Sequence, residues 1–201
     1  LRPEAWRSGR WSAADRSTPT NAARVEAHRP SRSVLGDRGL WPLAAVQMAS
    51  FGLSVVAGSL KIKLLEREGH GRSIAGVVGG LILFAGIVTR PAGGLLMRRA
   101  PDRAWTFVAT ALVAGSAGVL VLAAGPPLWI GAVAALVVGL SAGLPFAPIF
   151  NTTIRLRADA PAAAIGFVNG SAVLVILVGT PLAGLTFGIP GEGRLGFLII
   201  A

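Results

Sequence analysis

The sequence contains no cysteine. A disulfide framework and a metal site built from thiolates are therefore excluded for this chain. Charged residues make up only 14% of the chain, whereas hydrophobic residues make up 53% and the mean hydropathy is +0.66. A soluble domain of this length is usually less apolar. The composition thus argues against a soluble domain and calls for a search for hydrophobic runs of membrane length.

Acidic residues and histidine are absent from the long hydrophobic runs that follow residue 40. A proton relay in these runs has no carboxylate to use. The sequence also lacks a P-loop, a G-x-S-x-G motif and any group of nucleophiles, bases or metal ligands at one depth, which are the features that a membrane enzyme would need. We therefore expect no catalytic residues, no cofactor and no metal.

From Trp41 onward the sequence contains five apolar stretches. The length of each is close to or above the ~20 residues that a helix needs to cross the hydrocarbon core. They lie at about 41–60, 73–97, 104–125, 128–153 and 161–188, and a sixth begins at 195 and is cut off at Ala201. None shows the polar stripe of a soluble amphipathic helix. The predicted fold class is an all-α polytopic membrane protein, in which 41–201 form five transmembrane helices and the start of a sixth.

Residues 1–40 form a separate basic arm that is rich in Ser, Pro and Ala. The arm holds eight arginines against four acids and cannot bury a core, so we expect it to be disordered. Its arginines could bind nucleic acid or anionic lipid, but the positive-inside bias of a cytoplasmic flank explains the same charges. We favour the cytoplasmic flank and expect no nucleic-acid partner.

The connections between the predicted spans differ in charge. The arm, the turn at 98–103 and the turn at 154–160 fall on one side and are rich in arginine, whereas the opposite connections carry fewer basic residues. Because basic loops stay inside, we place residues 1–40 in the cytoplasm and the helices in the plasma (inner) membrane. Lys61 and Lys63 fit poorly, since they fall on the less basic side.

Small residues recur within the spans at the spacing of helix contacts. This pattern predicts a tight bundle and no particular function. The residues are Gly79, Gly86 and Gly93 with the Gly76–Gly80 pair in the second span, Ala135, Gly139 and Gly143 in the fourth, and Ala162, Gly166 and Gly170 in the fifth.

Pro145 and Pro148 lie inside the fourth span, where they remove backbone donors and should bend or unwind the helix. Irregular backbone is tolerated in a membrane where it lines a cavity, although a purely structural kink would look the same. Three amides, those of Gln47, Asn151 and Asn169, lie in predicted spans. A buried amide must find a partner, so these residues are candidates for a solute pathway or for hydrogen bonds between helices.

Residues 94–103 read GLLMRRAPDR and resemble the cytoplasmic loop motif of the major facilitator superfamily, G-x-L-a-D-R/K-x-G-R/K-R/K. Gly94, Leu96, Arg99 and Arg103 match the motif, whereas Arg98 stands at its aspartate position. The copy is similar to the degenerate one between helices 8 and 9 of that family. The resemblance implies a cytoplasmic gate formed by Gly94, Arg99 and Arg103, with Arg90 added from the inner end of the same span, although Arg90 could instead extend to the interface.

A second resemblance lies in the fifth span. Gly179, Pro181 and Gly184, in the run GTPLAG, are similar to the P-x-x-G core of the family's helix 5 motif, here at the position of helix 11. Together the two resemblances imply the C-terminal six-helix half of a larger transporter, with the arm as the central loop. The expected partners are the bilayer, a small solute and the missing N-terminal half or a second chain.

Two functions remain open from the sequence. The first is a secondary transporter that moves a small solute by alternating access, with this chain as one half. The second is a non-transporting membrane scaffold or assembly subunit, in which the glycine faces bind partner helices and the arm recruits lipid or a cytosolic protein. The identity of the solute and of any coupling ion does not follow from either interpretation.

Overall fold

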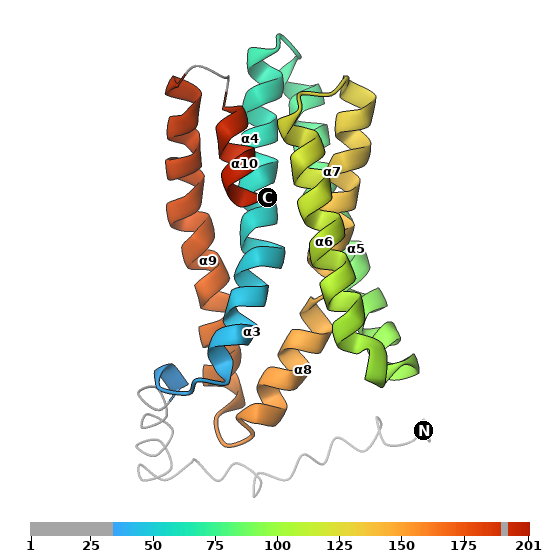
Figure 1. Ribbon diagram of the computed structural model, residues 1–201, viewed down its shortest axis with the longest axis vertical. Coiled ribbons are helices and arrows are strands. Elements are labelled where there is room, and N and C mark those ends of the chain that lie inside the picture. The colour runs from blue at the N-terminus through green and yellow to red at the C-terminus, as the bar shows by residue number, and fades with distance from the viewer. Residues whose placement is uncertain (1–33, 190–192) are drawn as a thin grey trace, which may run out of the picture.

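The computed structural model describes residues 34–189 and 193–201, and this part of the chain folds into helices without strands. Five segments are long and apolar enough to cross a membrane, and they run side by side in an up-and-down bundle (Figure 1). The segments are Leu40–Arg67, Arg72–Arg99, Pro101–Ala123, Leu128–Leu156 and Pro161–Gly188. A short helix, α10 (Arg194–Ile200), follows. The predicted all-α membrane fold with five spans and the start of a sixth is confirmed.

The spanning segments contain the following helices. They are α3 (Leu40–Gln47), the π-helical turn η3 (Met48–Gly52) and α4 (Leu53–Arg67) in the first segment, then α5 (Arg72–Arg99), the short η4 (Pro101–Arg103) with α6 (Ala104–Ala123), α7 (Leu128–Gly143) with α8 (Phe146–Leu156), and α9 (Pro161–Leu185) with η5 (Thr186–Gly188). Most of the basic arm, residues 1–33, lies outside the described residues, so its expected disorder stays a prediction.

The first segment runs further than its predicted end near residue 60. Leu60, Leu64 and Leu65 continue a buried apolar face, and the helix therefore extends to Arg67. Lys61 and Lys63 consequently lie within α4 and not in a connection. Glu66 lies in its last turn, so the prediction that no acid falls within a span is wrong for this helix.

The fourth segment is broken at the first of the two prolines that predict a bend, whereas α8 continues through Pro148. Helix α7 ends at Gly143, α8 begins at Phe146, and Pro145 stands directly before α8. Proline cannot donate to the helical ladder and its ring crowds the preceding turn, so the ladder stops there. Figure 1 shows that α8 leaves the axis of α7 and leans toward α3.

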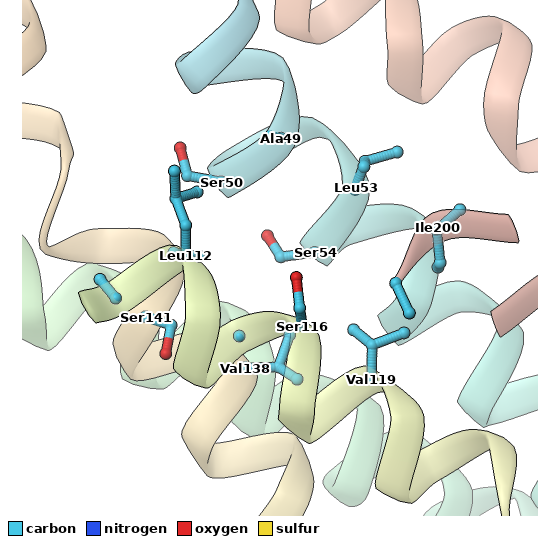
Figure 2. A pocket seen from close by; sticks show the side chains of 14 residues that line it. Ala49, Ser50, Leu53, Ser54, Leu112, Ser116, Val119, Val138, Ser141 and Ile200 are labelled. Carbon is cyan, nitrogen blue, oxygen red and sulfur yellow. The ribbon is translucent and has the colours of Figure 1, made fainter. Parts of the chain in front are cut away.

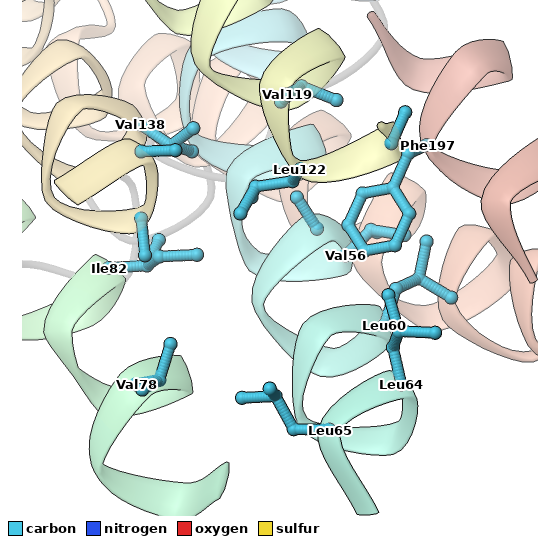
Figure 3. Packing of buried hydrophobic residues seen from close by; sticks show 14 of the residues in the cluster. Val56, Leu60, Leu64, Leu65, Val78, Ile82, Val119, Leu122, Val138 and Phe197 are labelled. Atoms are coloured by element: carbon cyan, nitrogen blue, oxygen red, sulfur yellow. The ribbon is translucent and has the colours of Figure 1, made fainter. Parts of the chain in front are cut away.

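Two hydrophobic clusters hold the bundle together. The larger one joins α4, α5, α6, α7 and α10 through side chains such as Leu60, Ile82 and Phe197 (Figure 3). The smaller one joins α3, α8 and α9 around Leu40, Ile149 and Val168. The π-helical turn η3 falls between α3 and α4, and thus between the two clusters along the first segment.

Helices α5 and α7 meet at glycines. A Cβ atom at Gly139 would collide with the backbone oxygen of Ile82, one at Gly143 with that of Gly86, and one at Gly93 with that of Leu144. Backbone atoms cannot move aside cheaply, so these positions require glycine. The sequence pattern also singled out four other glycines at which a Cβ would meet no other helix of the described residues within 4 Å, namely Gly76, Gly80, Gly166 and Gly170.

Candidate functional site

Two irregular stretches of backbone lie against each other near the middle of the bundle. Phe51 belongs to η3, and Phe146 is the first residue of α8, directly after the break. Their ring centroids are 5.6 Å apart in an edge-to-face arrangement, and Phe150 packs on Phe146 at 4.9 Å. π-Helical turns and broken membrane helices are both common at functional sites, because they expose backbone and re-aim side chains.

Arg90 brings a positive charge to this aromatic group. Its guanidinium carbon lies 4.0 Å from the centroid of the Phe146 ring and 5.5 Å from that of the Phe51 ring. Both distances fall in the range of cation–π attraction. The Arg90 Nε atom is buried and has no hydrogen-bond partner among the described residues. The guanidinium group of Arg90 is therefore in contact with two aromatic rings, while its Nε–H donor is not satisfied by a described residue.

A cavity of about 200 Å³ lies beside Arg90. Apart from Arg90 and Ser54, its walls are apolar or glycine, and they come from η3, α4, α5 and α7. Its principal side chains are those of Phe51, Ile82, Leu83 and Ile87. A second cavity of about 160 Å³ shares Ser54, Ile82 and Leu83 and continues along the glycine face of α5. The two cavities therefore adjoin along the first and second spanning segments, and together they are called the groove below.

A third cavity, of about 150 Å³, also has Ser54 in its wall (Figure 2). Four serine side chains line it, namely Ser50, Ser54, Ser116 and Ser141. The Ser54 hydroxyl donates to the Phe51 backbone oxygen at 2.8 Å, whereas the Ser50 hydroxyl has no partner among the described residues. Ser54 therefore belongs to the walls of both the groove, which Arg90 lines, and the third cavity, which is lined by four serine hydroxyl groups.

The three amides predicted for the solute pathway come from helices that pack on one another, α3, α8 and α9. Gln47 is completely buried, and neither of its amide atoms has a partner among the described residues. Asn151 is exposed on α8 and donates to Met97 Sδ at 3.2 Å, while Asn169 is half-buried on α9. None of the three lines the cavities described above.

The predicted gate residues separate into two places. Gly94 faces α8, where a Cβ would lie 3.8 Å from that of Ala147. Arg99 and Arg103 are exposed at the arm end of the bundle, and neither forms an ion pair within 34–189 or 193–201. Arg90 precedes Arg99 by nine residues, which is about 13 Å along a helix. The structure thus places Arg90 with the aromatic rings and apart from the two exposed arginines.

The motif of the fifth span lies against the first segment. A Cβ at Gly179 would lie 3.4 Å from Val56, and one at Gly184 would lie 4.0 Å from Lys63 Nζ. Pro181 is exposed within α9. The motif therefore places α9 beside α4 at ordinary packing distance.

Arg157 ties together the arm end of the chain and the turn before α9. It donates to Asp159 through two nitrogens, at 2.9 Å and 2.8 Å, and its third nitrogen lies 3.5 Å from Asp37. The hydrogen bonds from Arg157 are the main cause that holds the pKa of Asp159 below its usual range. Arg157 is itself nearly buried, and sequence reasoning missed it because its partners are set by the tertiary structure.

We expect Arg157→Ala to lower the thermal midpoint of the protein and Arg155→Ala, at an exposed position two residues away, to leave it unchanged. The Asp159 pKa is depressed in the folded state, so the contribution of the pair is present above the unfolded pKa and is lost as the pH falls through the folded one. Wild type should therefore lose more thermal stability in acid than Arg157→Ala does. Parallel pH curves for the two proteins would contradict this assignment.

Sequence reasoning found Arg90 but not its surroundings. Phe51 and Phe146 carried no signal in the sequence, because an aromatic residue in an apolar span is usual, and only the break at Pro145 pointed to this depth. A sequence model of the family described as Major Facilitator Superfamily matches residues 3–180. No curated protein and no solved structure matches the chain.

Proposed function

Because the chain belongs to the Major Facilitator Superfamily, a family of membrane transporters, we propose that it forms one bundle of a secondary transporter that moves a small solute by alternating access. The observation that carries the proposal is the contact between the π-helical turn η3 and the broken α7–α8 segment, beside a groove that contains Arg90. Such irregular backbone is kept in membranes where it lines a solute path.

The second bundle is supplied by an N-terminal half or by another chain, and the helices described here correspond to the C-terminal half. The multi-pass chain lies in the plasma membrane with residues 1–40 in the cytoplasm, because the basic arm and the basic turns share one side. The protein catalyses no covalent reaction on its solute. Apolar side chains of α9 such as Leu177 and Leu185 are exposed to about 70%, which suits a helix that faces lipid or a second bundle.

We assign Gln47, Asn151 and Asn169 to the cytoplasmic half of the solute path, since they come from the mutually packed α3, α8 and α9. Gly94, Arg99 and Arg103 form the cytoplasmic gate. The two exposed arginines are free to meet helix carbonyls or acids of the second bundle, and these contacts break when the gate opens.

Cysteine labelling tests the proposal without knowledge of the solute. We expect Leu83→Cys, in the groove, to react with a charged, membrane-impermeant maleimide, because alternating access brings water to it from each side in turn. Val113→Cys is the matched control: it lies near the middle of α6, and its side chain is exposed outside the groove. The reagent is applied to whole cells and to inverted vesicles of the full-length protein, in a background without other cysteines.

The expected result is that Leu83→Cys reacts from both sides and that Val113→Cys reacts from neither. Replacing Arg99 and Arg103 by Gln should increase the cytoplasmic reaction of Leu83→Cys, because the gate is then held less firmly. Asn151→Cys and Asn169→Cys should react from the cytoplasmic side. If Leu83→Cys reacts only after denaturation, the bundle contains no water-filled path and the transport proposal fails.

A further inference from the structure

Arg90 places a positive charge among the apolar helices of the bundle, where its side chain is half-buried. A guanidinium group stays protonated in proteins, and Arg90 lies only about 7 Å from the middle of α5 along the helix axis. A long side chain at this depth could extend toward the interface. Here it packs instead on the rings of Phe146 and Phe51. The charge therefore stays beside the rings, with its Nε atom buried and the rest of the side chain half-exposed.

No acid among the described residues compensates this charge. The ion pairs of 34–189 and 193–201 involve Arg72 and Arg157 and leave Arg90 without a carboxylate. Its Nε atom is buried without a hydrogen-bond partner. A partly desolvated cation favours an anion or hydrogen-bond acceptors, and aromatic faces replace only part of the lost hydration. The site thus has an unmet requirement for negative charge.

The cavity next to Arg90 specifies what kind of anion fits. A guanidinium group prefers a carboxylate, with which it forms two parallel hydrogen bonds. The remaining side chains around the cavity, Phe51, Leu83 and Ile87 among them, are apolar apart from Ser54. An inorganic anion would leave these walls without a favourable partner. The volume of about 200 Å³ is below the range typical of sites for drug-sized ligands, so the ligand is small.

We infer that this cavity binds a small organic monocarboxylate, whose carboxylate pairs with Arg90 and whose apolar body packs on Phe51, Leu83 and Ile87. The inference rests on the proposed transport function, because it names the class of solute that the path carries. Phe146 holds the guanidinium group in place from the opposite side. The fixed ring contacts pre-organise Arg90, so less side-chain freedom is lost when the anion binds.

Thermal unfolding of the purified full-length protein tests the inference. The probes are sodium benzoate and sodium pyruvate, with benzamide as a neutral molecule of the same shape as benzoate and sodium chloride to match the ionic strength. We expect at least one carboxylate to raise the unfolding temperature of wild type and benzamide to leave it unchanged. Arg90→Gln should weaken carboxylate binding by roughly tenfold or more, as expected when a charge-assisted pair is lost.

The control is Arg98→Gln, which removes an exposed arginine from the same helix and should preserve the carboxylate effect. If Arg90→Gln does not fold, Arg90→Lys replaces it: this variant keeps the charge without the two parallel bonds, so binding should be weaker but present. The inference is overturned if benzamide stabilises as much as benzoate, if no carboxylate stabilises wild type, or if the variants at Arg90 bind as well as wild type. Labelling of Leu83→Cys from both sides would then still support transport of another solute.

Discussion

Gly143→Leu should prevent the bundle from folding. Any side chain at this position meets the Gly86 backbone oxygen and the Thr89 hydroxyl of α5, and the backbone oxygen cannot move without separating α5 from α7. Overpacking of this kind costs about 1–3 kcal/mol for added methylene groups in a soluble core and more where the obstacle is backbone. A protein of marginal stability does not survive such a loss.

The measurement is size-exclusion chromatography of the full-length protein carrying a fluorescent tag, which reports the folded fraction after detergent extraction. Gly76→Ala is the matched control, because it lies in α5 and a Cβ there would meet no other helix within 4 Å in the part of the chain that the structure describes. It should be neutral or stabilising by about 0.5–1 kcal/mol, as replacement of a helical glycine usually is. A monodisperse peak from Gly143→Leu at the wild-type yield would show that α5 and α7 do not meet as described.

Lys61→Met should stabilise the protein. Lys61 is 0% exposed on α4, and its Nζ atom has no partner among the described residues. A Cβ at Gly131 of α7 would lie 3.4 Å from the end of its aliphatic chain, so the methylene groups are packed while the ammonium group is not paired. Replacement of a buried ion pair by apolar residues of similar volume is often neutral or stabilising by about 1–4 kcal/mol. An unpaired ammonium group has no partner to offset its desolvation, so a gain of this order is expected, and Met follows the same path as the lysine stem.

Lys63→Met is the control for this second change. Lys63 is exposed on the same helix, and its Nζ atom lies 5.0 Å from the centroid of the Phe187 ring, so its replacement should have a small, slightly destabilising effect. Thermal midpoints of the two variants and wild type give the comparison. A lower midpoint for Lys61→Met would mean that an anion outside the described residues pairs with Lys61.

The contrast between Lys61 and Lys63 shows where sequence reasoning stopped. Both residues were expected in a connection, because two lysines and a later Arg67 interrupt the apolar run. The helix continues through them since Leu60, Leu64 and Leu65 keep its buried face intact. Hydropathy averaged along the chain does not register a face, so the end of this helix was predicted too early.

The sequence by itself determined the number of spans, the break before Phe146 and the family resemblance. Each of these features depends only on residues that are close together in the chain. An apolar run of membrane length forms a helix wherever it packs, and a proline removes its donor in any surroundings. These features were predicted without knowledge of a single contact between helices.

Only the tertiary structure decided which faces meet. Membrane helices are apolar all round, so no polar stripe marks the side that faces the protein. Hence the pattern could not tell Gly143, where a Cβ would collide with α5, from Gly166, where a Cβ would meet no other helix of the described residues. It likewise grouped Arg90 with the gate arginines, whereas helix packing sets it on Phe146 beside a cavity. The rotation of each helix about its own axis decides which of its residues face a neighbouring helix. That rotation is fixed by contacts between residues far apart in the chain.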